Sequence, residues 1–164
     1  MKEKTRALIP VALLIFVFVV ALTAQSLPNQ ATGSGSDDPD ARPPVTQADV
    51  QIVQRARGIL SSQSRWNRAD TRKCPVDAKT FSLYCALEKA TDEVSGKFEH
   101  RGAAMQEARF VVDEIAPNRK NYNHRLMDYN NDPTTTFADI QKFFRLLEER
   151  VTRRLREESH GRNK

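Results

Sequence analysis

The sequence predicts an all-α protein: an N-terminal membrane or signal helix followed by a small domain of about four helices. Two observations lead to this fold class. Apolar residues after position 46 recur at the three- and four-residue spacing of amphipathic helices. The start of the chain instead carries an unbroken apolar run behind a basic cluster. We therefore expect a signal peptide or signal anchor over 1–26, a flexible linker over 27–45, a helical domain over 46–157 and a basic tail over 158–164.

The N-terminal segment is organised as an export or anchoring signal. Lys2, Lys4 and Arg6 precede the run Ala7–Ala24, which contains no charged side chain. At about 1.5 Å per residue this run reaches roughly 27 Å, close to the hydrocarbon thickness of a bilayer. A cleaved signal and a retained anchor both remain open. Because the basic residues stay on the cytoplasmic side, either alternative places the domain outside the cytoplasm, with the membrane as the partner of this segment.

The composition limits the classes of partner. The chain has 26 Lys and Arg against 21 Asp and Glu, a net charge of +5, and part of this excess belongs to the N-terminal segment. The remainder is a mild excess that supports solubility and argues against a nucleic-acid partner. The linker over 27–45 is rich in Gly, Ser, Pro and Asp and has almost nothing apolar to bury, which is typical of a flexible tether.

The first helix of the domain is predicted over about 47–62. Thr46 lies three residues before Asp49, the spacing of a capping box. The apolar positions that follow at helical spacing are Val50, Val53, Ala56, Ile59 and Leu60. Trp66 lies just beyond this helix, and we expect its ring to anchor the chain in the core. The alternative is an aromatic ring that stacks on a ligand.

Two more helices are predicted in the middle of the domain. Asp77 is the expected cap of the second, which ends at Gly96, and the third ends before Pro117. Their apolar faces consist of Phe81, Tyr84, Cys85, Leu87, Thr91 and Val94 in the second helix, and of Ala103, Ala104, Ala108, Val111, Val112 and Ile115 in the third.

The last helix follows a polar stretch without clear periodicity, residues 118–129. Asp132 and Pro133 belong to a run with turn chemistry, and we expect them to form a structural turn that leads into the helix. Thr136 and Asp139 repeat the capping spacing. The apolar stripe behind them consists of Phe137, Ile140, Phe144, Leu147, Val151 and Leu155.

The two cysteines predict a disulfide. Cys74 and Cys85 lie eleven residues apart in a domain expected outside the cytoplasm, where such bonds form and persist. A buried free Cys85 is the main alternative. A catalytic thiol is disfavoured because no histidine lies near either cysteine in the sequence, and metal binding lacks the C-x-x-C spacing of thiolate sites.

The sequence does not reveal what the domain does. We expect a binding or scaffolding module at the extracytoplasmic face, with an unknown protein partner, and we expect no catalytic residue, metal or cofactor. An enzyme is the second hypothesis: His124 and Asp128 would share a helix face, and with Asp132 they outline a metal-assisted or acid-base hydrolase. The third is a basic surface that binds anionic lipid or nucleic acid through the arginine-rich C-terminus, although interleaved glutamates weaken its field.

The order of three landmarks resembles an uncharacterised bacterial family known as a domain of unknown function. The landmarks are Trp66, then Tyr84-Cys85-Ala86-Leu87, then Tyr129-Asn130-Asn131-Asp132-Pro133 before Thr136-Phe137-Ala138-Asp139-Ile140. The family shows a Trp, a Trp-Cys-x-x-Gly-Ala-Leu helix and a Trp-Asn-Asp-x-Pro turn before a Thr-capped helix. The likeness covers about residues 50–151. Glu88, Lys89 and Cys74 depart from the pattern. The resemblance implies a helical fold and transfers no catalytic residue.

Overall fold

The computed structural model describes Asp38 and residues 40–161, all of which belong to the unit formed by residues 35–164. These residues form five α-helices and two short 3-10 helices, and the only β-structure among them is one isolated bridge. The predicted all-α class is therefore confirmed for this part of the chain. The expected signal or anchor helix over 1–26 lies outside the described residues. Within the part that is described, no helix has the length and apolar character needed to cross a membrane.

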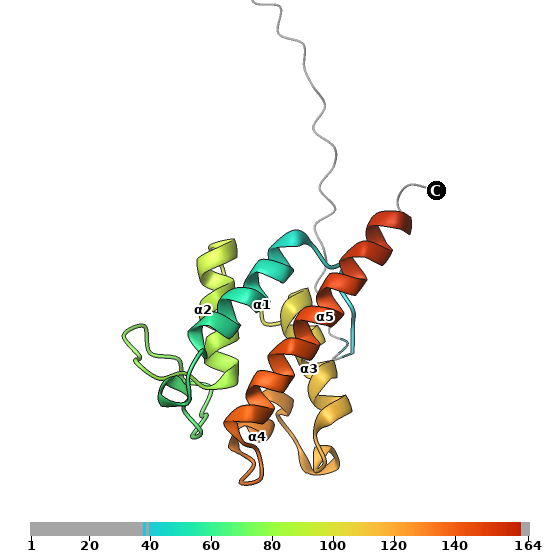
Figure 1. The fold of residues 1–164 in the computed structure, drawn as a ribbon. Coiled ribbons are helices and arrows are strands. Elements are labelled where there is room, and N and C mark those ends of the chain that lie inside the picture. The colour runs from blue at the N-terminus through green and yellow to red at the C-terminus, as the bar shows by residue number, and fades with distance from the viewer. Residues whose placement is uncertain (1–37, 39, 162–164) are drawn as a thin grey trace, which may run out of the picture. The chain divides into compact units, whose positions relative to one another are not determined.

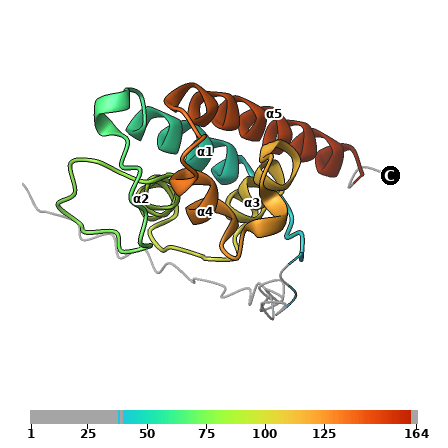
Figure 2. The ribbon, with the colours of Figure 1, turned by 90° about the horizontal axis from the view of Figure 1, so that it is seen from below.

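The helices of the domain lie in two layers. α1 (Gln47–Ile59) and α5 (Phe137–Gly161) lie side by side in one layer, and α2 (Leu83–Ser95), α4 (Arg125–Asn131) and α3 (Ala103–Ile115) form the other (Figure 1, Figure 2). Apolar side chains from both layers meet between them and leave water, which is the main source of stability. The fully buried ones include Val53, Leu60, Leu83, Leu87, Met105, Ile140, Phe143, Phe144 and Leu147.

Both helices of the first layer begin at a Thr-x-x-Asp cap. The Asp49 carboxylate accepts hydrogen bonds from the backbone N and Oγ1 of Thr46 at 2.8 and 2.7 Å. Asp139 accepts the same pair from Thr136 at 2.9 and 2.6 Å. Asp49 also accepts a bond from the backbone N of Ala104 at 2.9 Å. Each carboxylate thus supplies an acceptor where a helix start lacks one, and Asp49 ties the start of α1 to the start of α3.

The second helix starts later than the sequence predicts. The prediction of Asp77 as its cap is wrong: Ser82 is the N-cap, and its Oγ accepts a bond from the backbone N of Cys85 at 3.1 Å. The helix ends where expected, at Gly96, whose φ of +72° suits a residue without a Cβ. A Cys74–Cys85 disulfide, with Cα atoms 5.3 Å apart, ties the preceding loop to α2. The bond excludes a free Cys85 and a thiolate metal site in this structure.

A buried ion cluster joins the layers between α3 and α5. Glu107 on α3 is fully buried and accepts bonds from Arg150 Nε and Arg154 Nη1 of α5, both at 2.6 Å. Arg150 also pairs with Glu114 at 2.6 Å. A buried carboxylate is tolerated when it is paired and hydrogen-bonded in this way. Two cations of the C-terminal arginine run are therefore part of the packing between helices.

α4 is a helix that the sequence analysis does not predict. It spans Arg125–Asn131, within and just after the polar stretch 118–129, and it contacts both α2 and α3. A 3-10 turn over Arg119–Asn121 precedes it. With one apolar pair near its start, a helix this short shows no periodicity that distinguishes it from a loop.

The end of the stretch expected to be a linker contacts the domain. The Gln106 amide donates to the carbonyl of Ala41 at 2.8 Å, and the backbone N of Val45 donates to Glu158 at 2.8 Å. The Val45 side chain is buried, and the Arg42 guanidinium lies 4.1 Å from the centre of the Phe110 ring. Residues 40–45 therefore pack on α3 and α5. At the other end of the domain α5 continues to Gly161, inside the expected tail over 158–164.

Candidate functional site

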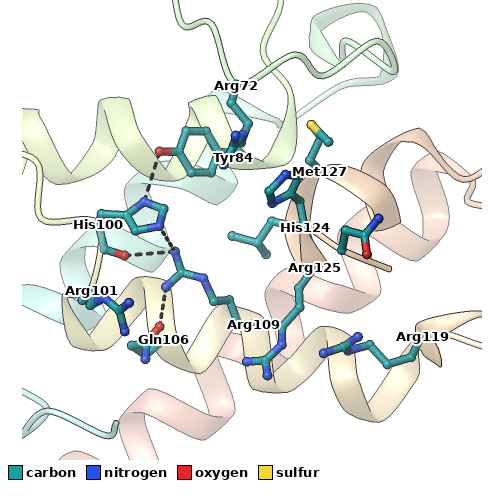
Figure 3. A pocket seen from close by; sticks show the side chains of 12 residues that line it. Arg72, Tyr84, His100, Arg101, Gln106, Arg109, Arg119, His124, Arg125 and Met127 are labelled. Carbon is teal, nitrogen blue, oxygen red and sulfur yellow. Dashed lines mark hydrogen bonds between the residues drawn. The ribbon is translucent and has the colours of Figure 1, made fainter. Parts of the chain in front are cut away.

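A cleft of about 260 Å³ opens on the layer formed by α2, α3 and α4 (Figure 3). We call it the arginine cleft, because its lining holds five arginines and two histidines and lacks any Asp or Glu. It is lined by Arg72, Tyr84, His100, Arg101, Gln106, Arg109, Arg119, Asn123, His124, Arg125, Leu126 and Met127. Side chains from separate stretches of the chain thus build a concave surface of one charge sign.

Only part of this positive charge is compensated. Asp113, outside the cleft, pairs with Arg119 and, at 3.2 Å, with Arg125. Arg125 also pairs with Asp40 at 2.8 Å. Arg72 and Arg109 form no ion pair with a carboxylate of the described residues. The cleft therefore carries excess positive charge that an anion would neutralise.

Arg109 stands at the centre of the cleft and its fork is held by neutral groups. One Nη donates to the Gln106 side-chain oxygen. The other donates to the ring of His100 at 3.1 Å and to the carbonyl of His100 at 3.0 Å. Partial burial, with the nearby cations of Arg125 and Arg101, lowers the pKa of Arg109 to about 10. The guanidinium remains charged at neutral pH and is fixed in direction, so its position is prepared before any ligand arrives.

His100 is fixed as the neutral ring by its two partners. A guanidinium only donates hydrogen bonds, so the Nε2 that faces Arg109 must accept, and the ring proton lies on Nδ1. Nδ1 lies 3.3 Å from the Tyr84 hydroxyl oxygen, which accepts that proton's hydrogen bond (Figure 3). Burial and the surrounding arginine cations lower the pKa of His100 below 6.5. Both ring nitrogens are engaged, so this histidine positions Arg109.

One side of the cleft is apolar. The Tyr84 ring packs edge-on against Phe98 with centroids 6.0 Å apart, and burial raises the pKa of its hydroxyl. Leu126 is buried and Met127 half-buried at the start of α4, and both line the cleft. Figure 3 shows Met127 opposite the ring of His100 across the opening. The cleft therefore offers charged donors beside an apolar surface.

Arg72 is held at the rim by a strained loop. Its φ is +57°, in the left-handed region that residues other than glycine rarely adopt. The Asp70 carboxylate accepts a bond from the backbone N of Arg72 at 2.6 Å and stabilises that turn. Asn131 of α4 brackets Asp70 from the other side, donating to its carbonyl and accepting from its backbone N, both at 2.8 Å. The disulfide at Cys74 then closes the loop onto α2.

A second polar group lies at the other end of α4. We call Asn130, Asn131 and Asp132 the asparagine hub. Asn130 is fully buried, and its side-chain oxygen accepts bonds from Trp66 Nε1 at 2.8 Å and from the backbone N of Leu83 at 3.0 Å. Its amide donates to the carbonyl of Asn67 at 3.0 Å. The hub thus joins α4 to the segment around Trp66 and to the start of α2.

Trp66 and Asp132 are both parts of this structural network. The Trp66 ring is buried and lies 6.2 Å from the Phe137 ring. Asp132 accepts bonds from the backbone N and hydroxyl of Thr134, from Asn118 and from the Tyr122 hydroxyl, and these bonds hold the pKa of Asp132 well below its usual value. A carboxylate with this many donors is neither a ready proton acceptor nor a free metal ligand.

The three residues of the hydrolase hypothesis lie in three different surroundings. His124 lines the arginine cleft. Asp128 accepts bonds from the backbone N of Asn123 and of His124, both at 2.7 Å, at the start of α4. Asp132 belongs to the hub, next to Pro133, whose carbonyl together with that of Asp132 accepts from Arg68. Among the described residues no group of three or more His, Cys, Asp or Glu is placed to hold a metal ion.

Most of the residues that line the cleft carry no recognisable signal in the sequence. Arg72, Arg101, Arg109, Arg119 and Arg125 are spread over more than fifty positions without a common period. The nearest signal in the sequence is the adjacent pair His100–Arg101 in the turn before α3, which is too short to distinguish a site from a charged surface. Only the packing of α2, α3 and α4 brings these side chains to one place.

A family model described as a family of unknown function, DUF6197, matches residues 44–150. No curated protein and no solved structure matches the chain. The matched residues include the whole lining of the arginine cleft and the asparagine hub.

Proposed function

Because the chain belongs to the DUF6197 family of unknown function, we propose its role from its own geometry: it is a binding module that holds an anionic ligand in the arginine cleft. The observation that carries this proposal is the lining itself, with five arginines, two histidines and no carboxylate. Like charges held together cost free energy unless a counter-charge joins them. Guanidinium forks match the oxygens of carboxylate and phosphate groups.

Binding accounts for the cleft better than catalysis does. A general base or nucleophile needs a nitrogen or oxygen with room for the reacting atom. Both ring nitrogens of His100 already have partners. His124, the other histidine of the cleft, has no carboxylate in the lining to orient its ring, because Asp128 and Asp132 are occupied by backbone and side-chain donors. A hydrolase built on His124, Asp128 and Asp132 therefore finds no support in the arrangement of these side chains.

We further propose that this module works outside the cytoplasm, held to the membrane or exported by its N-terminal segment. The basic and apolar order of that segment supports this placement, and so does the Cys74–Cys85 disulfide, a bond typical of oxidising compartments. An intact-mass measurement on material from membrane and soluble fractions, without reductant, tests it. A reduced, unprocessed chain found only in the cytosol would contradict it.

Calorimetric titration tests the binding role. The full-length chain in neutral detergent micelles is titrated with benzoate, phenyl phosphate and neutral benzamide. We expect the anions to bind, benzamide not to bind, and the affinity to fall with added sodium chloride because the cleft is partly exposed. In Arg109→Gln, which removes the central cation, anion binding should be lost. Arg153→Gln is the control, since Arg153 is an exposed arginine of α5 outside the cleft.

Two outcomes would refute this role. One is the absence of heat for every anion at low salt. The other is an equal loss of affinity in Arg153→Gln and Arg109→Gln, which would trace binding to net charge. Binding that is seen only with anionic vesicles, and that depends equally on both arginines, would indicate a basic surface that binds anionic lipid.

A further inference from the structure

The uncompensated positive charge of the arginine cleft is larger than one monoanion can neutralise. Arg72 and Arg109 have no carboxylate partner among the described residues, and Arg101 donates to a backbone carbonyl, that of Asp38, at 2.7 Å. Arg119 and Arg125, by contrast, share Asp113. A ligand with two negative charges compensates this group better than one with a single charge, because each uncompensated guanidinium gains from a nearby anion.

The guanidinium groups also approach from different directions. Arg72 comes from the loop before α2, Arg101 from the turn before α3, Arg109 from the middle of α3, and Arg119 and Arg125 from the 3-10 turn and α4 (Figure 3). A carboxylate offers two coplanar oxygens, which one fork can satisfy. A phosphate monoester offers three terminal oxygens that point apart, so it can use donors from several sides.

The apolar side of the cleft and its volume indicate that the bound anion carries an organic substituent. Tyr84, Leu126 and Met127 have no charge to offer a phosphate, yet they line the same space. Ligand pockets commonly measure roughly 300 to 1,000 Å³, and this one, at about 260 Å³, falls just below that range. It therefore suits a charged head with a short apolar or aromatic group attached.

From these features we infer that the arginine cleft recognises a phosphomonoester, with the phosphate between the arginines and its organic group against Leu126 and Met127. This inference rests on the proposed function, that the cleft binds anions. A soluble phosphomonoester and the head group of a phosphatidic acid carry the same chemistry. The experiment separates these two sources.

The test compares probes that differ in one property at a time. The full-length chain in neutral detergent micelles is titrated at pH 7.5, where a phosphomonoester is mostly dianionic. Phenyl phosphate against benzoate compares a dianionic phosphate with a carboxylate on the same ring. The comparison of phenyl phosphate with inorganic phosphate measures how much the phenyl ring contributes to the affinity. We expect phenyl phosphate to bind about tenfold more tightly than either, equivalent to about 1.4 kcal/mol.

The matched variants assign the effect to one arginine. Arg72→Gln should weaken phenyl phosphate about tenfold and benzoate much less, because the second negative charge of the phosphate gains more from an additional cation than a monoanion does. Arg72→Lys keeps the charge and loses the fork, so it should recover only part of the affinity. Arg153→Gln changes the net charge equally and should change neither probe.

Short-chain lipids then identify the source. Dihexanoyl phosphatidic acid is a phosphomonoester, and dihexanoyl phosphatidylglycerol is a phosphodiester with one negative charge. Tighter binding of the phosphatidic acid than of phenyl phosphate assigns a lipid head group, and weaker binding assigns a soluble ligand. If the phosphatidylglycerol, a diester, binds as tightly as the phosphatidic acid, the inference is overturned.

Failure of the inference differs from failure of the proposed function. Should benzoate bind as tightly as phenyl phosphate, or should Arg72→Gln weaken both equally, the cleft is an anion site without phosphate selectivity. Should no anion bind and Arg109→Gln change nothing, the cleft is not an anion site at all, and both proposals fall.

Discussion

α4 carries a polar group at each of its ends, and the two differ in how their hydrogen-bonding groups are used. At its C-terminal end Asn130 and Asp132 are buried, and they and Asn131 are bonded to neighbouring donors and acceptors. At its N-terminal end Arg125 and the residues beside it face the arginine cleft, where positive charge exceeds its local compensation. One helix of seven residues thus carries a polar network with its partners supplied at one end and a group of uncompensated charges at the other.

The difference separates structural from functional polarity. A buried polar group with all of its partners costs little and fixes one arrangement of the chain, so it needs no ligand. A cluster of like charges without partners is a cost of folding that only a counter-ion offsets. The hub also helps to position one residue of the cleft, because Asn131 bonds the backbone of the loop that leads to Arg72.

The largest effect is expected from Asn130→Ala. This change leaves the Trp66 indole N–H and the backbone N–H of Leu83 buried without an acceptor. At about 1 to 3 kcal/mol for each unsatisfied donor, we expect the free energy of unfolding to fall by about 3 kcal/mol or more. Urea unfolding followed by tryptophan fluorescence measures it, since Trp66 is the single tryptophan of the chain.

The control for this change is Asn121→Ala. Asn121 is exposed and its side chain forms no hydrogen bond among those described, so the substitution should stay within about 0.5 kcal/mol of the wild type. A similar, small change for both variants would mean that the hub does not hold the fold together.

Removal of the disulfide should have the next largest effect. Reduction of the Cys74–Cys85 bond, which closes a loop of sequence separation 11, should lower the free energy of unfolding by about 2 to 3 kcal/mol on the chain-entropy model. Urea unfolding with and without dithiothreitol measures the loss. The double variant Cys74→Ala/Cys85→Ala is the control and should not respond to the reductant. An identical response of the two proteins would show that the bond contributes nothing.

The starts of the helices show how far the sequence alone predicts the fold. Local rules place the starts of α1 and α5, because a Thr and an Asp three residues apart bond to each other and cap their own first turn. The same local reading puts the cap of α2 at Asp77, since it does not include the disulfide and the bridge at Phe81 that delay the helix to Ser82. Errors arise where tertiary contacts override a local preference.

α4 and the arginine cleft could not be predicted for the same reason. Asn130 and Asn131 favour turns in isolation, and they end a helix here because Trp66 and Asp70 supply partners from distant parts of the chain. The cleft depends on five arginines that no single element contains. The spacing of His124 from Asp128 predicts a site residue, yet His124 lines the arginine cleft while the Asp128 carboxylate bonds backbone N–H groups at the start of α4.

Arg72→Gln should change stability much less than the hub variant. The Arg72 guanidinium forms no hydrogen bond among the described contacts, and other cations lie nearby. We expect the free energy of unfolding to stay within about 0.5 kcal/mol of the wild type, the range of surface substitutions. Urea unfolding in the absence of any anion measures it. A loss comparable to that of Asn130→Ala would make Arg72 a structural residue and the contrast between the two ends of α4 would disappear.

The smallest effect is a shift in the titration of His100. Burial and the cations of the cleft hold the pKa of His100 below 6.5, so the unfolded chain takes up its proton at a higher pH than the folded one. The resulting stability is fully present above about pH 6.5 and is lost as the pH falls through the folded pKa. Arg109→Gln removes a cation and the donor to Nε2, so the pKa of His100 should rise; imidazole NMR titration against Arg153→Gln, which leaves His100 unchanged, measures it. An unchanged or lower value in Arg109→Gln would show that Arg109 does not hold the ring neutral.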